Sequence, residues 1–283
     1  MNAMNRIKEY LVALGDLFLP RTCLACGCRL GLRERHLCLA CAADVPYTRY
    51  WLQEHNPMAD RFNAVLERYR DPAERMDYAH AAALFLYKGS YRAIPRALKY
   101  HGNIAAGHFY GTLLGRRLAS VPFWADVDLI LPVPLHWTRR WTRGYNQAEV
   151  LARAIAAAYS PGAFTLSDEA RNPPEVRTDL LVRARRTRTQ TRLSVGEKAR
   201  NVASAFRVPD SPAAFLASAR HILLVDDTFT TGATLAACYR ALRPFTQARV
   251  SIATLAAVEG TPSDTGATTP GAPSGTSPAP APG

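Results

Sequence analysis

The chain has 283 residues, of which 48% are hydrophobic and 20% charged, which excludes a wholly disordered protein and predicts about two domains. Its 35 lysines and arginines outnumber 23 aspartates and glutamates, giving a formal net charge of +12. A charge of this size favours an anionic partner such as nucleic acid, anionic lipid or a phosphorylated small molecule. A basic surface that only keeps the protein soluble would give the same charge.

The N-terminal residues 1–20 predict an amphipathic helix that ends at Pro20. Charged residues interrupt its apolar pattern and no small-residue cleavage site follows, so we do not expect a secretory signal. No apolar run approaches the ~18 residues that a membrane span needs. We therefore expect a cytoplasmic protein without a membrane span. In that reducing compartment, clustered cysteines bind metal more often than they pair with each other.

Residues 21–46 contain five of the six cysteines and predict a zinc module. Two Cys-x2-Cys pairs complete a tetrahedron around zinc, and four thiolates leave no open position, so the metal is expected to be structural. Gly27 follows the first pair, where the turn tolerates a residue without a side chain. Cys28 and His36 are alternative ligands that rank lower because either one breaks the symmetry of the two pairs. The expected ligands are Cys23, Cys26, Cys38 and Cys41.

The same module carries Arg29, Arg33 and Arg35. These side chains lead to the hypothesis that the module contacts a nucleic-acid backbone, and only their charge supports it. The sixth cysteine, Cys238, falls on a predicted helix and is expected to be a core residue.

Residues 47–77 are irregular and mixed in charge, and predict a connector with some helix. From Tyr78 onwards strands and helices alternate, which is typical of an α/β domain with a mainly parallel sheet flanked by helices, here over 78–259. Residues 260–283 have almost nothing to bury and predict a disordered tail. The expected strands are 79–89, 127–135, 222–225 and 248–258, and the expected helices lie within 90–103, 104–118, 146–159 and 233–243.

The segment ILLVDDTFTTGAT, residues 222–234, predicts a phosphate-binding loop. A buried strand ends at Asp226 and Asp227, and a short loop leads straight into a helix, whose N-terminus attracts phosphate. The two acids are placed to accept hydrogen bonds from vicinal ribose hydroxyls or to hold a metal-bound water. The alternative is an ordinary strand–turn–helix with threonine caps. The residues expected to contact the phosphate are Thr228, Thr230, Thr231, Gly232, Ala233 and Thr234.

This segment resembles the 5-phosphoribosyl-1-diphosphate (PRPP) motif of type I phosphoribosyltransferases. In that family the paired acids bind the ribose hydroxyls and the loop binds the 5′-phosphate, which implies PRPP together with magnesium. A second strand end, Pro-Val-Pro at 132–134, is followed by an arginine cluster that suits a diphosphate. Taken alone, those arginines also fit a basic loop without a ligand.

An arginine-dense stretch, residues 180–206, predicts a mobile loop that closes over an anionic ligand. A solvated basic face is the alternative. Type I phosphoribosyltransferases carry a flexible catalytic loop here, which implies a catalytic role for Arg188. With Lys99 and Arg143, Arg188 completes the expected contacts to the anionic ligand.

The motifs Pro-Val-Pro-Leu, Arg-Gly-Tyr-Asn-Gln, Lys-x-Arg-Asn-Val and Asp-Asp-x-x-Thr-Thr-Gly follow the cysteine module in that order. This arrangement, over about 20–258, resembles the ComF family of competence proteins. Thr187 and Gln190 keep the family's spacing, although additional arginine surrounds them. The resemblance implies a zinc finger joined to a type I phosphoribosyltransferase-like domain, and a role in handling imported single-stranded DNA during natural transformation, alongside other competence proteins.

Three functions remain open on the sequence. The first is a PRPP-binding, phosphoribosyltransferase-like protein that acts in DNA uptake or processing. The second is a salvage or biosynthetic phosphoribosyltransferase acting on a base or amine, for which residues 47–77 offer no patterned acceptor site. The third is a DNA-binding adaptor whose ligand site is regulatory or vestigial. The phosphate loop favours the first two, and the zinc module with the positive charge favours the first and third.

Overall fold

The structure is a computed structural model. The predicted N-terminal helix, residues 184–204 of the arginine-dense stretch and residues 261–283 of the predicted tail lie outside the residues that it describes. The described residues are 20–68, 70, 76–100, 102–135, 137–159, 172–183, 205–210 and 213–260.

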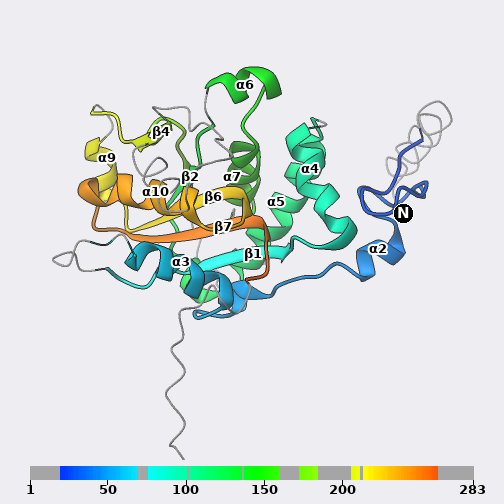
Figure 1. The fold of residues 1–283 in the computed structure, drawn as a ribbon, viewed down its shortest axis with the longest axis horizontal. Coiled ribbons are helices and arrows are strands. Elements are labelled where there is room, and N and C mark those ends of the chain that lie inside the picture. The colour runs from blue at the N-terminus through cyan, green and yellow to red at the C-terminus, as the bar shows by residue number, and fades with distance from the viewer. Residues whose placement is uncertain are drawn as a thin grey trace, which may run out of the picture.

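A five-stranded parallel sheet lies at the centre of the fold, with strand order β1-β7-β6-β2-β3 (Figure 1). The predicted α/β class with a mainly parallel sheet is confirmed. Two short strands outside this sheet, β4 and β5, pair antiparallel. The strands are β1 (Ala81–Leu86), β2 (Leu129–Pro132), β3 (Glu175–Val176), β4 (Val182–Arg183), β5 (Phe206–Arg207), β6 (His221–Phe229) and β7 (Arg249–Ala257).

Helices cover both faces of the sheet, because the strands are apolar on both sides. In β6, Ile222 packs with α3, α9 and α10, whereas Leu223 packs with α4, α5 and α7. The helices are α2 (Leu39–Ala43), α3 (Pro57–Glu67), α4 (Ala93–Tyr100), α5 (Ile104–Ala119), α6 (Trp137–Arg143), α7 (Gln147–Ala157), α9 (Ala213–Ser218) and α10 (Ala233–Leu242). Single 3-10 turns span Tyr50–Leu52, Gly89–Arg92, Pro122–Trp124 and Arg243–Phe245.

The core also includes Cys238, which is fully buried in α10, as the sequence predicts. Among the described residues, no helix is both long and apolar enough to cross a membrane.

Part of the segment expected to be a connector packs into the α/β core. Asn56 caps α3 by accepting hydrogen bonds from the backbone N–H groups of Met58 and Ala59, and its amide donates to the Ala81 carbonyl oxygen in β1 at 2.9 Å. Phe62, one turn into α3, is fully buried between β1 and α10. A local sequence pattern does not reveal this packing, because α3 is short and its partners lie far along the chain.

Three glycines of α5 allow that helix to lie against α7 at close range. Glycine is unfavourable inside a helix, yet the helix spans Ile104–Ala119 without a break. A Cβ atom at Gly111 would lie 2.8 Å from the Ala154 Cβ, and one at Gly115 would lie 2.7 Å from the Ile155 carbonyl oxygen. A side chain at either position would collide with α7, so the glycines permit this close packing.

We expect Gly115→Ala to lower the free energy of unfolding. In an unconstrained helix this change stabilises by about 1 kcal/mol, but here the added methyl meets the α7 backbone and overpacking costs about 1–3 kcal/mol. Urea unfolding followed by circular dichroism measures the difference. His108→Ala, on an exposed position of the same helix, should leave the midpoint almost unchanged. A more stable Gly115→Ala protein would contradict the close packing.

A buried polar cluster lies at the start of β6, at the opposite end of the strand from Asp226 and Asp227. The His221 ring is fully buried, with Nδ1 at 2.8 Å from Asp126 Oδ1 and Nε2 at 2.8 Å from the Ser251 hydroxyl. Arg249 donates to the same Asp126 carboxylate at 2.5 Å. Burial lowers the pKa of His221 to about 4, so the ring is neutral near pH 7. A neutral ring that donates from Nδ1 and accepts at Nε2 satisfies both partners.

This pKa shift makes the protein less stable in acid. Because the folded pKa is about 4 and the unfolded pKa is about 6.5, the unfolded state binds the proton more readily between those values. The difference in proton binding at His221 should therefore lower the free energy of unfolding by up to about 3 kcal/mol as the pH falls through this window. His221→Gln should flatten the fall, measured as urea midpoints from pH 7 to pH 4, whereas His108→Gln should not. Equal slopes in all three proteins would sink this assignment.

Candidate functional site

The twin acids lie where β6 extends beyond its neighbour β2. The pairing of β2 with β6 ends at Val225, whereas β6 continues to Phe229 and pairs only with β7 over those last residues. Asp226 and Asp227, expected at the end of the strand, are therefore inside it, because β6 continues for two residues beyond them. The reason is that β7 continues the ladder of hydrogen bonds past the end of β2.

The carboxyl ends of β2 and β6 lie side by side at the point where the sheet changes direction. From β2 the chain proceeds outward to β3, and it later returns to add β6 and β7 on the other side. In open parallel sheets, this switch point is where ligands bind. The Pro-Val-Pro segment and the acid segment, predicted separately, meet here: the Val133 N–H donates to the Val225 carbonyl oxygen at 2.8 Å.

The two carboxylates have different surroundings. Asp227 is buried and forms an ion pair with Lys99 from α4, with Oδ1 and Nζ at 2.8 Å. Lys99 Nζ also lies 3.5 Å from the Thr228 hydroxyl. The Asp226 carboxylate accepts a hydrogen bond from the Asp227 backbone N–H at 2.8 Å. Burial, followed by the charge of Asp227, raises the pKa of Asp226 to about 7.

The loop after β6 turns through a left-handed glycine directly into a helix. Gly232 has φ = 76°, the left-handed region that favours glycine, and α10 begins at the next residue. A Cβ atom at Gly232 would also lie 2.9 Å from the Phe229 ring, so two constraints exclude a side chain there. Thr230 and Thr231 are exposed, and Ala233 and Thr234 at the start of α10 are half-buried.

Arg61 of α3 holds this loop from the side, and sequence reasoning missed it. Its guanidinium donates to the Thr230 carbonyl oxygen at 2.7 Å and to the Val258 carbonyl oxygen at 2.6 Å, and lies over the Phe229 ring at 5.3 Å. No motif marks Arg61, because its partners are far away in sequence and two of them are backbone atoms.

Arg143 lies beside the same end of α4 that carries Lys99. Its guanidinium donates to Gln147 Oε1 at 2.9 Å and lies 5.3 Å from the centre of the Tyr100 ring. The Tyr145 hydroxyl donates to the Leu98 carbonyl oxygen in α4. The Arg-Gly-Tyr-Asn-Gln motif thus fixes α4 against the start of α7.

Asn146 completes that motif. It caps α7 by accepting from the Ala148 N–H and donates to the Val133 carbonyl oxygen at 3.1 Å, which ties α7 to the end of β2.

Arg183, in β4, lies close enough for its charge to oppose the rise in the pKa of Asp226. The sequence shows it only as one of many arginines. Arg188 lies outside the described residues.

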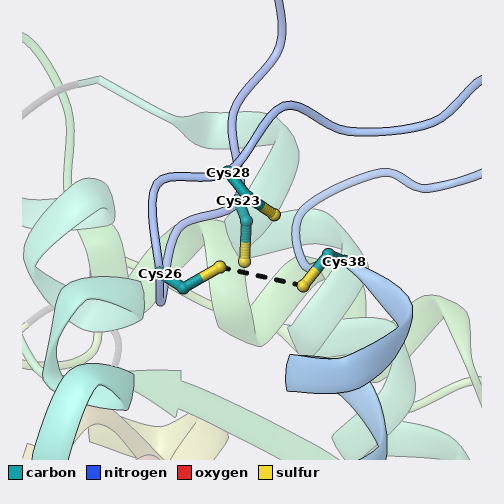
Figure 2. A group of neighbouring side chains, drawn as sticks. All are labelled: Cys23, Cys26, Cys28 and Cys38. Atoms are coloured by element: carbon teal, nitrogen blue, oxygen red, sulfur yellow. Dashed lines mark hydrogen bonds between the residues drawn. The ribbon is translucent and has the colours of Figure 1, made fainter.

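The cysteine module brings several thiols to one place. Four sulfurs, from Cys23, Cys26, Cys28 and Cys38, lie within 4.8 Å of one another (Figure 2). A tight turn supplies the first three: Gly27 adopts φ = 76°, and its N–H donates to the Cys23 carbonyl oxygen at 2.9 Å. Cys38 precedes α2, and Figure 2 shows its side chain pointing toward the turn.

The loop between the two halves of the module is held by one carboxylate. Glu34 accepts hydrogen bonds from the N–H groups of Gly31 and Leu39, each at 2.6 Å. Arg21 donates to the carbonyl oxygens of Gly31 and Glu34. These contacts position Cys38 against the turn.

The chemistry of these sulfurs fits a divalent cation. Hydrogen bonds from the Cys28 N–H and from the neighbouring thiols lower the pKa of Cys26 to about 6. Hydrogen bonds with the sulfurs of Cys26 and Cys38 are the main cause that raises the pKa values of Cys28 and Cys41. A zinc ion would replace these sulfur–sulfur contacts by binding four thiolates tetrahedrally.

Three predicted ligands, Cys23, Cys26 and Cys38, lie within the four-sulfur group. Cys28, which ranks lower on the sequence, is its fourth member, and Cys41 is not. Cys41 is nevertheless adjacent, since its thiol interacts with the sulfurs of Cys26, Cys38 and Cys23. Five thiols are thus available for four ligand positions.

The chain is similar to Competence protein F of Haemophilus influenzae, with 33% identity over 116 residues, 41% of this chain and 44% of that protein. It is 33% identical over 128 residues to DNA utilization protein YhgH of Salmonella typhi, 44% of this chain and 45% of that protein. The resemblance to the ComF family is confirmed. With YhgH of Escherichia coli K12 the identity is 34% over 109 residues, 38% and 40% of the two chains. The chain spans less than half the length of these relatives. No family model matches it.

We expect Cys26→Ser to lose bound zinc, because Cys26 belongs to both possible ligand sets. Cys28→Ser should keep close to one zinc per chain, because Cys41 remains beside the other three sulfurs. Zinc content after gel filtration, measured by atomic absorption, distinguishes the variants. Cys238→Ala, which removes the buried thiol of α10, is the control and should keep the metal. Loss of zinc from Cys28→Ser but not from Cys41→Ser would assign Cys28 as the fourth ligand instead.

Proposed function

We propose that the carboxyl ends of β2 and β6 bind PRPP, and that the protein uses this site in the uptake or processing of single-stranded DNA. The observation that carries the proposal is the extension of β6 beyond β2, which leaves Asp226 and Asp227 at the switch point of the sheet, directly before a glycine turn and a helix N-terminus. A single ligand that carries both a vicinal diol and a phosphate matches the acid pair and the turn before the helix.

Each part of the ligand has a counterpart in the chain. The carboxylates accept hydrogen bonds from the two vicinal ribose hydroxyls. The backbone N–H groups around Gly232 donate to the 5′-phosphate, and the positive end of the α10 dipole favours its negative charge. Lys99, already paired with Asp227 at 2.8 Å, lies beside the acids, where it can also meet the diphosphate. Arg143 adds a second cation from the same side.

The protonation of Asp226 affects this binding. With a pKa raised to about 7, the Asp226 carboxyl is about half protonated near neutral pH, so its ability to accept a hydrogen bond from the diol depends on pH. A bound magnesium ion would neutralise the diphosphate and favour the ionised form of both acids. The chain itself supplies the orientation: β6 fixes the acids and Arg61 fixes the loop.

The proposed role with DNA rests on the names of similar proteins and on the net charge of the chain. One similar protein is named for competence and another for DNA utilization, and this chain is identical to each at about a third of the aligned residues. The net charge of +12 suits a nucleic-acid partner. The five-thiol module supports a zinc finger, which would be worth about 10–16 kcal/mol of apparent binding energy to so small a unit.

The double variant Asp226→Ala/Asp227→Ala should bind PRPP more than about 100-fold more weakly, because hydrogen bonds to charged groups contribute about 1.5–3 kcal/mol each. Isothermal titration with PRPP and magnesium measures this affinity. Asp77→Ala/Asp210→Ala removes the same charge from two exposed positions and should bind like the parent protein. Unchanged affinity in the first variant would remove the basis of the assignment.

A second measurement separates the three functions that the sequence leaves open. Pyrophosphate release is followed with PRPP and magnesium, with and without an oligonucleotide. Release that requires DNA supports the proposal, and release with a free base or amine supports the salvage enzyme. Binding without release supports the adaptor.

A further inference from the structure

A cleft of about 640 Å³ lies between the cysteine module and α5, away from the acid pair. None of its lining residues belongs to the candidate site at the end of β6. The module supplies one wall and α5 the other. The lining residues are Arg21, Arg35, His36, Ala105, His108, Phe109, Thr112, Leu113 and Arg116.

The wall formed by α5 has two parallel stripes. His108, Thr112 and Arg116 recur every four residues, so they lie in one row along the helix. Phe109 and Leu113 form the neighbouring row. The polar row is about 12 Å long at 1.5 Å per residue, and it ends at the exposed Arg116.

The wall formed by the module continues the same chemistry. Arg35 is exposed, and the adjacent His36 ring packs against the Phe109 ring with centroids 5.1 Å apart. Phe109 nevertheless keeps 39% of its surface exposed. Phe109, which lines the cleft together with Arg35 and Arg116, therefore leaves part of its surface open to contact.

The charged side chains that line the cleft are all basic. Three arginines and two histidines line the cleft, and no aspartate or glutamate is among the lining residues. Such a surface attracts anions and repels cationic partners. Exposed aromatic rings beside cations are the combination that binds single strands, because every base has a face for stacking and every nucleotide has a phosphate. A free anion would use the arginines but not Phe109.

We propose that this cleft binds single-stranded nucleic acid, with Arg35 and Arg116 contacting phosphates and a base stacking on Phe109. The proposal rests on the proposed role in DNA handling and gives that role a location. It extends the hypothesis drawn from the arginines of the module, since half of the site belongs to α5. A duplex fits the proposal less well, because its bases are not free to stack on a protein ring.

The test is the binding of a fluorescein-labelled oligothymidylate, measured by fluorescence anisotropy over a series of salt concentrations. Arg35→Gln/Arg116→Gln should weaken binding and reduce the slope of log K against log salt by about 1.4, at about 0.7 for each phosphate contact on a single strand. Phe109→Ala should weaken binding roughly tenfold with the slope unchanged, because stacking is not ionic.

The control Arg153→Gln/Arg207→Gln removes two exposed arginines outside the cleft and should keep the slope. Zinc content and circular dichroism show whether each variant is folded. Equal slopes in the two double variants, with the parent protein binding DNA, would overturn the cleft and leave the proposed function standing. A parent protein that does not bind the oligonucleotide would overturn both. Tighter binding of a duplex, unaffected by Phe109→Ala, would exclude a single strand.

Discussion

The unequal length of two neighbouring strands is the constraint on which the candidate site depends. Because β6 continues past β2 while still paired with β7, Asp226 and Asp227 stand on a rigid strand with one open side. A loop would allow these carboxylates to move, whereas the strand fixes the backbone that carries them. Fixed positions of this kind are what the proposed recognition of a diol would require.

The ion pair of Lys99 and Asp227 follows from that arrangement. A carboxylate as buried as Asp227 is costly without a partner, and Lys99 supplies a positive charge at 2.8 Å. For the neighbouring Asp226, burial and then the charge of Asp227 raise the pKa to about 7. Two chemically identical side chains, adjacent in sequence, thus have different surroundings, because Asp227 faces Lys99 of α4.

The sequence predicts those features that local patterns encode. The apolar runs predict the strands, the acid pair with Gly232 predicts the turn into α10, and the clustered cysteines predict a metal module. Contacts between distant segments have no such pattern: Arg61 and Thr230 are 169 positions apart. The glycines of α5 illustrate the same limit, since their value depends on α7. The choice between Cys28 and Cys41 also depends on geometry, because spacing alone favours the two symmetric pairs.

The contact between the cysteine module and the 3-10 turn before α4 has a mechanical consequence. The Tyr91 hydroxyl donates to the Cys41 carbonyl oxygen at 2.9 Å, and Tyr91 lies at the start of the segment that becomes α4. Lys99, near the far end of that short helix, contacts Asp227. The two-turn helix α4 therefore links a backbone contact of the cysteine module to the residue that pairs with Asp227.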